Sequence, residues 1–528
     1  MWILAGMWLA IALLDASVNA FSYDINVSAE LEVPPGSSKA IQHDFASFSL
    51  PAHFFADYAG NHTHPNLFSR DIFDLLYNKT GSHPFVRVGG TSTDRVWYNA
   101  SQEPAFINEY SLTGITAELG IATRVSVGPI WFEGFQNFPS SRWSYQVNMG
   151  SSYNETGGLE NALQVARLVM DAVRENLDAF EIGNEPELMA LVGVRTENYT
   201  VDDYVLEWNL YADAISAFVL KGNPYGLDDS RFFQAFTIGG DEEPWTGLDV
   251  WKAGIDRGDH VKSVSFHQYA ASNQAWVRLQ DSYMNHTANK DNLTQYVPEI
   301  EYASQYDPFI PLVLGETNSN SYNLNMSQIE GVFGSALWLI DHLMMGMALN
   351  ITRYNLIQGT TFGYSAWVPV PSGGRQPYVR APLYGQIFTA DALGHHPQVQ
   401  VKALDADLPW NMSAYAFYEG CELAKYAIIN LDEWNSTSSY ERPSQQIQLT
   451  VPNGETRVRV ERLTGDGASA DQGIEWAGLS WNYTDGRLLQ SGEYHSEWLD
   501  VGQDGKATLT IPSTQAVLIT LNGTASDA

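Results

Sequence analysis

The chain has very little cysteine and few basic residues. Cys421 is its one cysteine in 528 residues, so neither an intrachain disulfide nor a cysteine-built metal site can form. We expect Cys421 to be a small buried apolar side chain. Lys and Arg number 28 against 61 Asp and Glu, a formal net charge of −33. That charge disfavours nucleic acid, anionic membranes and highly sulfated polysaccharides as partners.

Long apolar runs are also scarce, and the one that stands out lies at the N-terminus. Residues 2–14 are uniformly apolar but too short to span a bilayer comfortably, and Val18-Asn19-Ala20 offers the small residues that a signal peptidase reads. We therefore expect residues 1–20 to be a signal peptide and the mature protein to be secreted, without a membrane anchor. No Lys or Arg precedes the run, which leaves an uncleaved anchor as the alternative.

Asn-X-Ser/Thr sequons indicate the same route. Fourteen are present, several times the number expected by chance. N-glycans need surface positions in a protein that passes through a secretory pathway, which also suggests a eukaryotic source. Two further sequons are at Asn26 and Asn522, and we assign Asn350 to the entrance of a buried strand. We expect glycosylation at Asn61, Asn78, Asn99, Asn154, Asn198, Asn285, Asn292, Asn325, Asn411, Asn435 and Asn482.

Residues 41–394 alternate short apolar runs with segments of helical period, which is typical of βαβ units around a parallel sheet. Apolar side chains from Leu159 to Val173 recur at helical spacing, and Asp71–Leu76 predicts a second helix. Eight strand-helix units fit a (β/α)8 barrel, whose chemistry lies at the C-terminal ends of the strands. The expected strands are Phe45–Leu50, Phe85–Val88, Ala122–Val127, Ala179–Ile182, Phe236–Ile238, Ser263–Phe266, Leu312–Leu314 and Ile351–Ile357.

Residues 395–528 show a different pattern, with short alternating strands separated by Gly, Asp and Asn. This pattern predicts a C-terminal β-sandwich. Residues 21–40 contain one alternating stretch, Tyr23–Val33, which precedes the first barrel strand and is expected to pair within the sandwich. The predicted sandwich strands include Tyr426–Leu431, Gln446–Val451, Arg457–Leu463 and Ala507–Ile511.

Two apolar strands of the predicted barrel end in glutamate. Phe180-Glu-Ile-Gly-Asn-Glu-Pro-Glu187 places Glu185 after strand four, and Pro311-Leu-Val-Leu-Gly-Glu-Thr-Asn318 places Glu316 after strand seven. A carboxylate pair at one barrel mouth suits glycoside hydrolysis, because one acid protonates the leaving oxygen while the other attacks the anomeric carbon or activates water. Asn184, beside the first acid, is placed to bind a sugar 2-hydroxyl.

With these motifs the sequence resembles glycoside hydrolase family 79, which includes fungal-type β-glucuronidases and the more distant heparanase-like enzymes. The resemblance runs through Arg87-Val-Gly-Gly-Thr-Ser-Thr-Asp94, the two glutamate motifs, Phe266-His-Gln-Tyr269 and the β-rich tail. It implies that Glu185 is the acid/base and Glu316 the nucleophile. Tyr269 is then a hydrogen-bond partner of the nucleophile.

The resemblance is less regular where the family binds the uronate carboxylate. The family has a Tyr five residues after the nucleophile, followed by glycines. This chain has Ser321 at that spacing, then Tyr322, Asn323 and Leu324, so we expect a one-residue bulge that brings Tyr322 to the site. A second family Tyr, after strand eight, corresponds to Tyr364.

Three other polar residues are assigned smaller roles. Arg87 is expected to pair with barrel carboxylates, Asp94 to contact sugar hydroxyls at a flanking subsite, and His267 to orient its neighbours. No metal or cofactor is expected, since His395-His396 lacks further residues at ligand spacing.

The sequence therefore predicts a retaining exo-β-glucuronidase that removes terminal glucuronic acid, with or without a 4-O-methyl group, from carbohydrate substrates. Two alternatives remain open: another retaining exo-β-glycosidase, such as a xylosidase or glucosidase, and a non-catalytic carbohydrate-binding wall protein on the same fold.

Overall fold

The computed structural model describes residues 25–118, 120–150, 156–228, 230–272, 274–306, 308–321, 327–404, 408–452 and 454–521. The expected signal peptide, Tyr322 and the sequons at Asn154, Asn325 and Asn522 lie outside these residues. In the described part, no helix is both long and apolar enough to cross a membrane.

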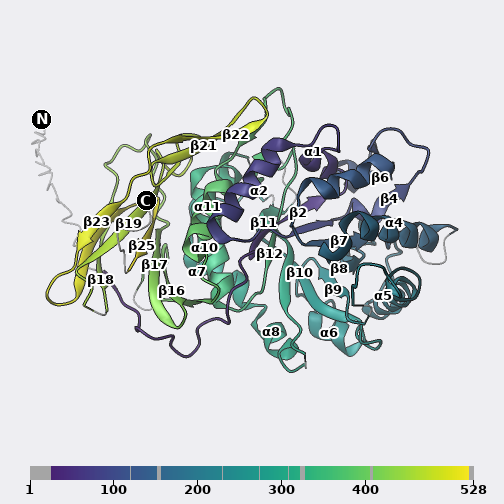
Figure 1. Ribbon diagram of the computed structural model, residues 1–528, viewed down its shortest axis with the longest axis horizontal. Helices are drawn as coiled ribbons and strands as arrows, with labels where there is room; N and C mark the ends of the chain where they lie inside the picture. Colours follow the sequence, from purple (N-terminus) through teal and green to yellow (C-terminus); the bar gives the residue numbers. More distant parts are fainter. Residues whose placement is uncertain are drawn as a thin grey trace, which may run out of the picture.

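The centre of the molecule is a closed barrel of eight parallel strands, as the sequence predicts (Figure 1). Each strand pairs with the next in parallel register, and strand β12 closes the ring by pairing Tyr354 with Ala46 of β2. The barrel strands are β2 (Ala46–Pro51), β3 (Val86–Gly89), β7 (Trp143–Val147), β8 (Leu177–Ile182), β9 (Phe233–Ile238), β10 (Val261–Ser272), β11 (Leu312–Ser321) and β12 (Tyr354–Ile357).

The helices around the barrel bury one face against the strands. In α4, buried Ala162, Val165 and Val169 recur at helical spacing, which confirms the amphipathic helix expected before the fourth strand. The α-helices are α1 (Phe55–Ala59), α2 (Leu67–Thr80), α3 (Ile115–Glu118), α4 (Gly158–Val173), α5 (Val201–Ile215), α6 (Gly247–Lys252), α7 (His286–Thr294), α8 (Val297–Ala303), α9 (Ser327–Glu330), α10 (Phe333–Ala348) and α11 (Pro382–Leu393).

The third barrel strand is not the one that the sequence indicated. Ala122–Val127 does form a strand, β6, but it lies in a separate sheet with β4 (Val96–Tyr98) and β5 (Phe106–Tyr110). The barrel position belongs to β7, whose five residues are all buried. Ser144 and Gln146 of β7 point into a polar barrel interior, so the strand lacks the apolar run by which the others were recognised.

The C-terminal residues form a β-sandwich with a core of its own. Its larger sheet has the order β15-β16-β17-β25-β19-β20-β21-β22, with β23 paired to β19. The smaller sheet is β1-β18-β24, in which Ile25–Val27 (β1) pairs in parallel with β18, as expected for the N-terminal stretch. The bounds are β15 (Val399–Ala403), β16 (Met412–Glu419), β17 (Glu422–Asn430), β18 (Ser444–Thr450), β19 (Arg457–Thr464), β20 (Glu475–Trp476), β21 (Leu479–Thr484), β22 (Arg487–Gly492), β23 (Glu497–Asp500), β24 (Lys506–Pro512) and β25 (Gln515–Thr520).

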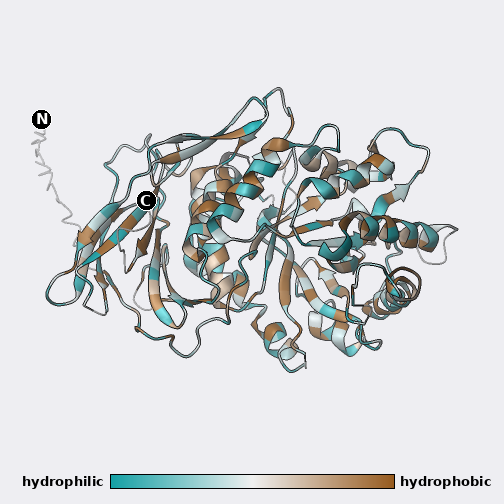
Figure 2. Cartoon of the chain, in the orientation of Figure 1, coloured by the Kyte–Doolittle hydropathy of each residue, from teal (hydrophilic) through white to brown (hydrophobic). Residues whose placement is uncertain are grey.

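The barrel and the sandwich meet through α10 and α11, which lie between them in Figure 1. Almost every residue of each helix is buried, which agrees with the many apolar side chains that both helices carry (Figure 2). A two-stranded sheet of β13 (Trp367–Val368) and β14 (Tyr378–Val379) follows the last barrel strand.

Two smaller expectations are corrected. Cys421 is exposed rather than buried, because it occupies the hairpin turn between β16 and β17, where it and Gly420 both have positive φ. Asn350 follows the end of α10 and is partly exposed, four residues before the buried strand β12 begins.

Candidate active site

A cavity of about 1130 Å³ opens at the C-terminal ends of the barrel strands. Residues within or just after seven of the barrel strands line it, namely Pro51, Gly90, Glu185, Gly239, Tyr269, Glu316 and Ile357 together with their neighbours. The ends of parallel strands all face the same side of a barrel, so residues far apart in sequence meet there. Both strand-end glutamates expected to carry chemistry are among them.

Glu185 reaches the cavity through an unusual backbone turn. Strand β8 ends at Ile182, Gly183 has φ 75°, and Glu185 itself adopts the left-handed region with φ 44°. A left-handed non-glycine residue is strained and persists only when neighbours fix it. Here the Glu185 N–H donates to the Thr237 carbonyl at 2.8 Å, and Pro186 follows. The side chain is 16% exposed, and burial raises its pKa to about 7.

Glu316 lies within β11 with both carboxylate oxygens occupied. Oε1 accepts a hydrogen bond from the Tyr269 hydroxyl at 2.7 Å, and Oε2 accepts one from Arg87 Nη1 at 2.8 Å. The preceding Gly315 has no room for a side chain, because a Cβ there would lie 2.0 Å from Ser265 Oγ. The Gly-Glu pair therefore lets two barrel strands approach closely while the carboxylate faces the cavity.

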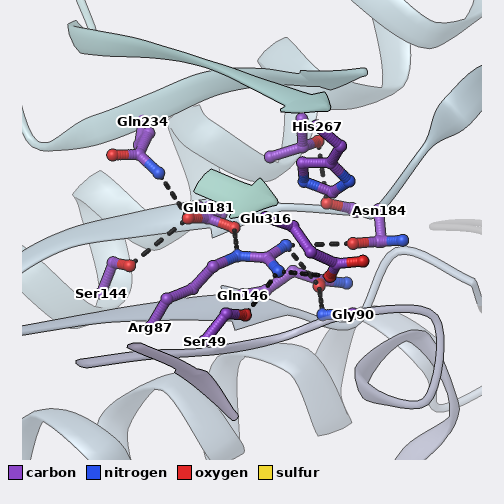
Figure 3. Close-up of polar contacts among 12 residues, drawn as sticks. Ser49, Arg87, Gly90, Ser144, Gln146, Glu181, Asn184, Gln234, His267 and Glu316 are labelled. Atoms are coloured by element: carbon purple, nitrogen blue, oxygen red, sulfur yellow. Dashed lines mark hydrogen bonds and ion pairs between the residues drawn. The ribbon is translucent and has the colours of Figure 1, made fainter. Parts of the chain in front are cut away.

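Arg87 connects the candidate nucleophile to the barrel interior (Figure 3). Its guanidinium is fully buried and donates from Nε to Glu181 at 2.8 Å, besides its bond to Glu316. Burial alone lowers the pKa of Arg87, but the two carboxylates hold it above its usual range. Glu181 also accepts bonds from Gln234 and Ser144. The network fixes Glu316 in one orientation, the structural role that the sequence suggested for Arg87.

His267 is positioned against the other glutamate. Its Nδ1 lies 2.9 Å from Glu185 Oε1, and burial lowers the pKa of His267 to about 4, so the ring is neutral. One oxygen of each glutamate and a ring nitrogen of His267 lie within 4.8 Å of one another. Such a group has ligand geometry for a metal, yet both oxygens of Glu316 already bind Tyr269 and Arg87, and the guanidinium charge opposes a second cation. The arrangement fits proton transfer better.

The remaining expected residues fall into three groups. Asn184 lies beside the site, where its Oδ1 accepts from Arg87 Nη2 at 3.0 Å. Tyr364 lines the cavity next to Tyr269, with ring centroids 6.5 Å apart. Tyr322 is outside the described residues. Asp94 does not line the cavity.

The structure shows a supporting role for Asp94. Its carboxylate is buried and accepts backbone hydrogen bonds from Met149, Gly150 and Asn184. It ties the loop after β7 to the loop after β8, and in this way supports the backbone that carries Glu185. This role could not be predicted from the sequence, because the three donors are 55 to 90 residues away.

Glu187 is a cavity residue to which the sequence assigned no role. Its Oε1 accepts from the Gly239 N–H at 2.5 Å, and its buried Oε2 has no hydrogen-bond partner. Burial, and then the charge of Glu185, raise the pKa of Glu187 to about 8. A Cβ on Gly239 would lie 2.6 Å from Glu187 and 3.3 Å from Glu185, so this glycine admits both carboxylates. The motif Asn-Glu-Pro-Glu contained Glu187, but only the turn at Pro186 directs it to the site.

The chain is similar to known fungal enzymes. A β-glucuronidase from Aspergillus niger is 32% identical over 521 residues, which cover 95% of this chain and 94% of the relative. The chain belongs to glycoside hydrolase family 79. Residues 414–518 of this family 79 enzyme match the model described as the glycosyl hydrolase family 79 C-terminal beta domain. A Neurospora crassa β-glucuronidase is 28% identical, covering 94% of this chain and 96% of its own.

Solved structures share the fold of the family 79 enzyme. A 4-O-α-L-rhamnosyl-β-D-glucuronidase from Fusarium oxysporum, in complex with Rha-GlcA, aligns with a TM-score of 0.78 at 21% identity, over 94% of this chain and all of that one. A family 51 α-L-arabinofuranosidase from Bifidobacterium longum aligns with a TM-score of 0.59 at 13% identity, over 93% and 98% of the two chains. At these identities the likeness establishes the barrel-and-sandwich architecture.

Proposed function

We propose that this family 79 enzyme is a retaining exo-β-glucuronidase, with Glu185 as acid/base and Glu316 as nucleophile. The observation that carries the proposal is the closeness of the two carboxylates: one oxygen of Glu185 and one oxygen of Glu316 lie within 4.8 Å of each other, which supports the shorter of the two arrangements known for glycosidases. Retaining glycosidases hold their carboxyl groups about 5–5.5 Å apart, whereas inverting enzymes need about 6.5–9.5 Å to admit a water. The name of the two fungal relatives supports glucuronic acid as the sugar.

Each residue then has a defined step. Glu185, protonated because burial raises its pKa, gives its proton to the glycosidic oxygen as that bond breaks. Glu316 attacks the anomeric carbon and forms a glycosyl ester, while Arg87 and Tyr269 keep its carboxylate aligned. Glu185, now ionised, removes a proton from the water that cleaves the ester. His267 holds the Glu185 carboxyl in place through both steps.

Neutral donors hold the glucuronate carboxylate in this proposal. No Lys or Arg lines the described part of the cavity. Hydrogen bonds to an ionised group are roughly twice as strong as neutral ones, so hydroxyl donors suffice for one carboxylate. We assign this role to Tyr364 and Tyr322.

The stereochemistry of the first product tests the mechanism. ¹H NMR during hydrolysis of an aryl β-glucuronide should first detect β-glucuronic acid, and early α-anomer would mean inversion. Rates on matched p-nitrophenyl β-glucuronide and β-glucoside test the sugar, because these substrates differ only at C6. A glucoside or xyloside rate equal to the glucuronide rate would favour another exoglycosidase. Binding of these glycosides without turnover would favour a carbohydrate-binding protein.

Two variants test the division of roles. Glu316→Gln should abolish turnover of every glycoside. Glu185→Gln should spare the first step for leaving groups that need no proton, such as 2,4-dinitrophenol, and slow alkyl glucuronides about 10²–10⁴-fold. Equal losses on both kinds of substrate would contradict the assignment.

We also propose that the protein is secreted and N-glycosylated. All eleven sequon asparagines within the described residues are at least partly exposed, and Asn26, Asn78, Asn99, Asn198 and Asn482 are the most open. Expression in a eukaryotic host should give a secreted chain that begins near Phe21. Digestion with a glycan-releasing amidase should lower its mass, and an intact N-terminus in a membrane fraction would contradict the proposal.

A further inference from the structure

The active-site cavity extends well beyond the two glutamates. Its volume of about 1130 Å³ exceeds the upper end of what a drug-sized ligand usually fills, so one sugar ring occupies only part of it. Its outer walls are formed by the end of β5 with the segment before β6, and by the segment after β10. Strands β5 and β6 belong to the small β4-β6-β5 sheet, which stands beside the barrel near α1 and α4 (Figure 1).

Both outer walls present an aromatic side chain to solvent. Tyr110, the last residue of β5, is 51% exposed, and Trp276, after β10, is 66% exposed. Among the described tryptophans Trp276 is the most exposed. Both line the cavity, as do apolar Ile121 and Leu188. Rings left open beside a catalytic centre offer flat apolar surfaces on which a ligand ring can stack.

The charges of the cavity are all of one sign. Five glutamates line it, and Glu242 and Glu243 lie exposed on the loop after β9. Burial lowers the pKa of the lining His53 to about 4, so this ring adds no positive charge near neutral pH. A negative group on the leaving part of a substrate would face these carboxylates without a basic partner in the described lining.

We propose that Tyr110 and Trp276 form an aglycone subsite that selects a leaving group with an apolar or aromatic ring and no negative charge. The proposal rests on the glycosidase function above and adds the class of leaving group. The rings stack on the aglycone, while Glu242 and Glu243 exclude acidic aglycones and accept neutral or cationic ones.

Methyl and benzyl β-glucuronide test the subsite. Methanol and benzyl alcohol are similarly acidic, so the ratio of their kcat/KM values reports aglycone binding rather than leaving-group chemistry. The benzyl glucuronide should be preferred by about tenfold or more. Tyr110→Ala and Trp276→Ala should each lower the benzyl value about fivefold, equivalent to about 1 kcal/mol, and leave the methyl value unchanged. Tyr440→Ala and Trp410→Ala, which remove exposed rings outside the cavity, are the matched controls.

Failure of the subsite and failure of the proposed function give different results. A wild-type ratio near one, or equal losses on methyl and benzyl substrates, would overturn the subsite. Absence of turnover on both glucuronides would overturn the glucuronidase proposal. The methyl and benzyl glycosides of whichever sugar the enzyme does hydrolyse would then test the subsite.

Charged aglycones test the glutamates. The 4-(aminomethyl)benzyl glucuronide should be cleaved faster than the 4-carboxybenzyl glucuronide, and the double variant Glu242→Gln/Glu243→Gln should narrow the difference. A preference for the carboxybenzyl substrate in the wild type would refute the role of charge. Raising the ionic strength should narrow the difference as well, since exposed charges are screened.

Discussion

Replacing Glu185 with Gln should stabilise the protein at pH 8 and leave its stability unchanged at pH 4. Burial raises the pKa of Glu185 from an ordinary 4.5 to about 7 in the folded state. Below pH 4.5 the carboxyl is protonated in both folded and unfolded chains, and Gln is close to it in shape. Between pH 4.5 and 7 the unfolded chain releases the proton while the folded chain keeps it, so folding stability falls as pH rises.

Above pH 7 the wild type bears the full free-energy cost of burying the ionised carboxylate. At 1.36 kcal/mol per pKa unit this cost is about 3 kcal/mol. Glutamine cannot ionise and avoids this cost. Because unfolding entropy scales with chain length, the melting temperature of Glu185→Gln should exceed that of the wild type by about 3 °C at pH 8. Near pH 4 the two should melt together.

Calorimetry or circular dichroism melts from pH 4 to pH 8 measure this difference. Glu160→Gln, at an exposed position of α4, is the matched control for removing a surface carboxylate. A difference in melting temperature that is constant across this pH range, or a variant less stable than the wild type at pH 8, would refute the view that burial disfavours the ionised form of Glu185.

Three further predictions concern the groups around the glutamates. Tyr269→Phe removes the 2.7 Å hydrogen bond to Glu316 and should lower kcat about 10- to 100-fold with an unchanged melting temperature, as steady-state kinetics and melts can test. Arg87→Met leaves Glu181 and Glu316 buried without their cation and should lower the free energy of unfolding by about 3–5 kcal/mol. A urea unfolding midpoint equal to that of the wild type would contradict this prediction. The charge of Glu185 helps to raise the pKa of Glu187, so Glu185→Gln should lower the pKa of Glu187 below about 8 in a carboxyl NMR titration, whereas an unchanged pKa would contradict the coupling.

The barrel could be predicted from sequence wherever its strands contain a short apolar run. Seven of the eight strands were located in this way, and both glutamates follow from their position at strand ends. The third strand was missed because Ser144 and Gln146 bond the buried charges of Glu181 and Arg87. An apolar run indicates a strand that is buried among apolar side chains. This part of the barrel interior is polar, so its strand has no such run.

Prediction of the site from sequence is limited in the same way, because contacts between distant segments are not visible in the sequence. Position at the strand ends pointed to Glu185 and Glu316, and the resemblance to family 79 implied that Tyr269 is a partner of Glu316. The backbone contacts of Asp94 could not be predicted, because its partners come from other loops.

The sequence alone determined the class of fold, the positions of the two carboxylates and the excess of negative charge, because hydrophobic period, strand-end residues and composition are local properties. Only the tertiary structure decided which groups surround those carboxylates: the guanidinium of Arg87 on Glu316, the ring of His267 and the unpaired oxygen of Glu187 near Glu185, and the exposed rings of Tyr110 and Trp276 in the same cavity. These groups come from strands and loops separated by tens to hundreds of residues. Their distances, and the burial that shifts their pKa values, exist only once the barrel has closed.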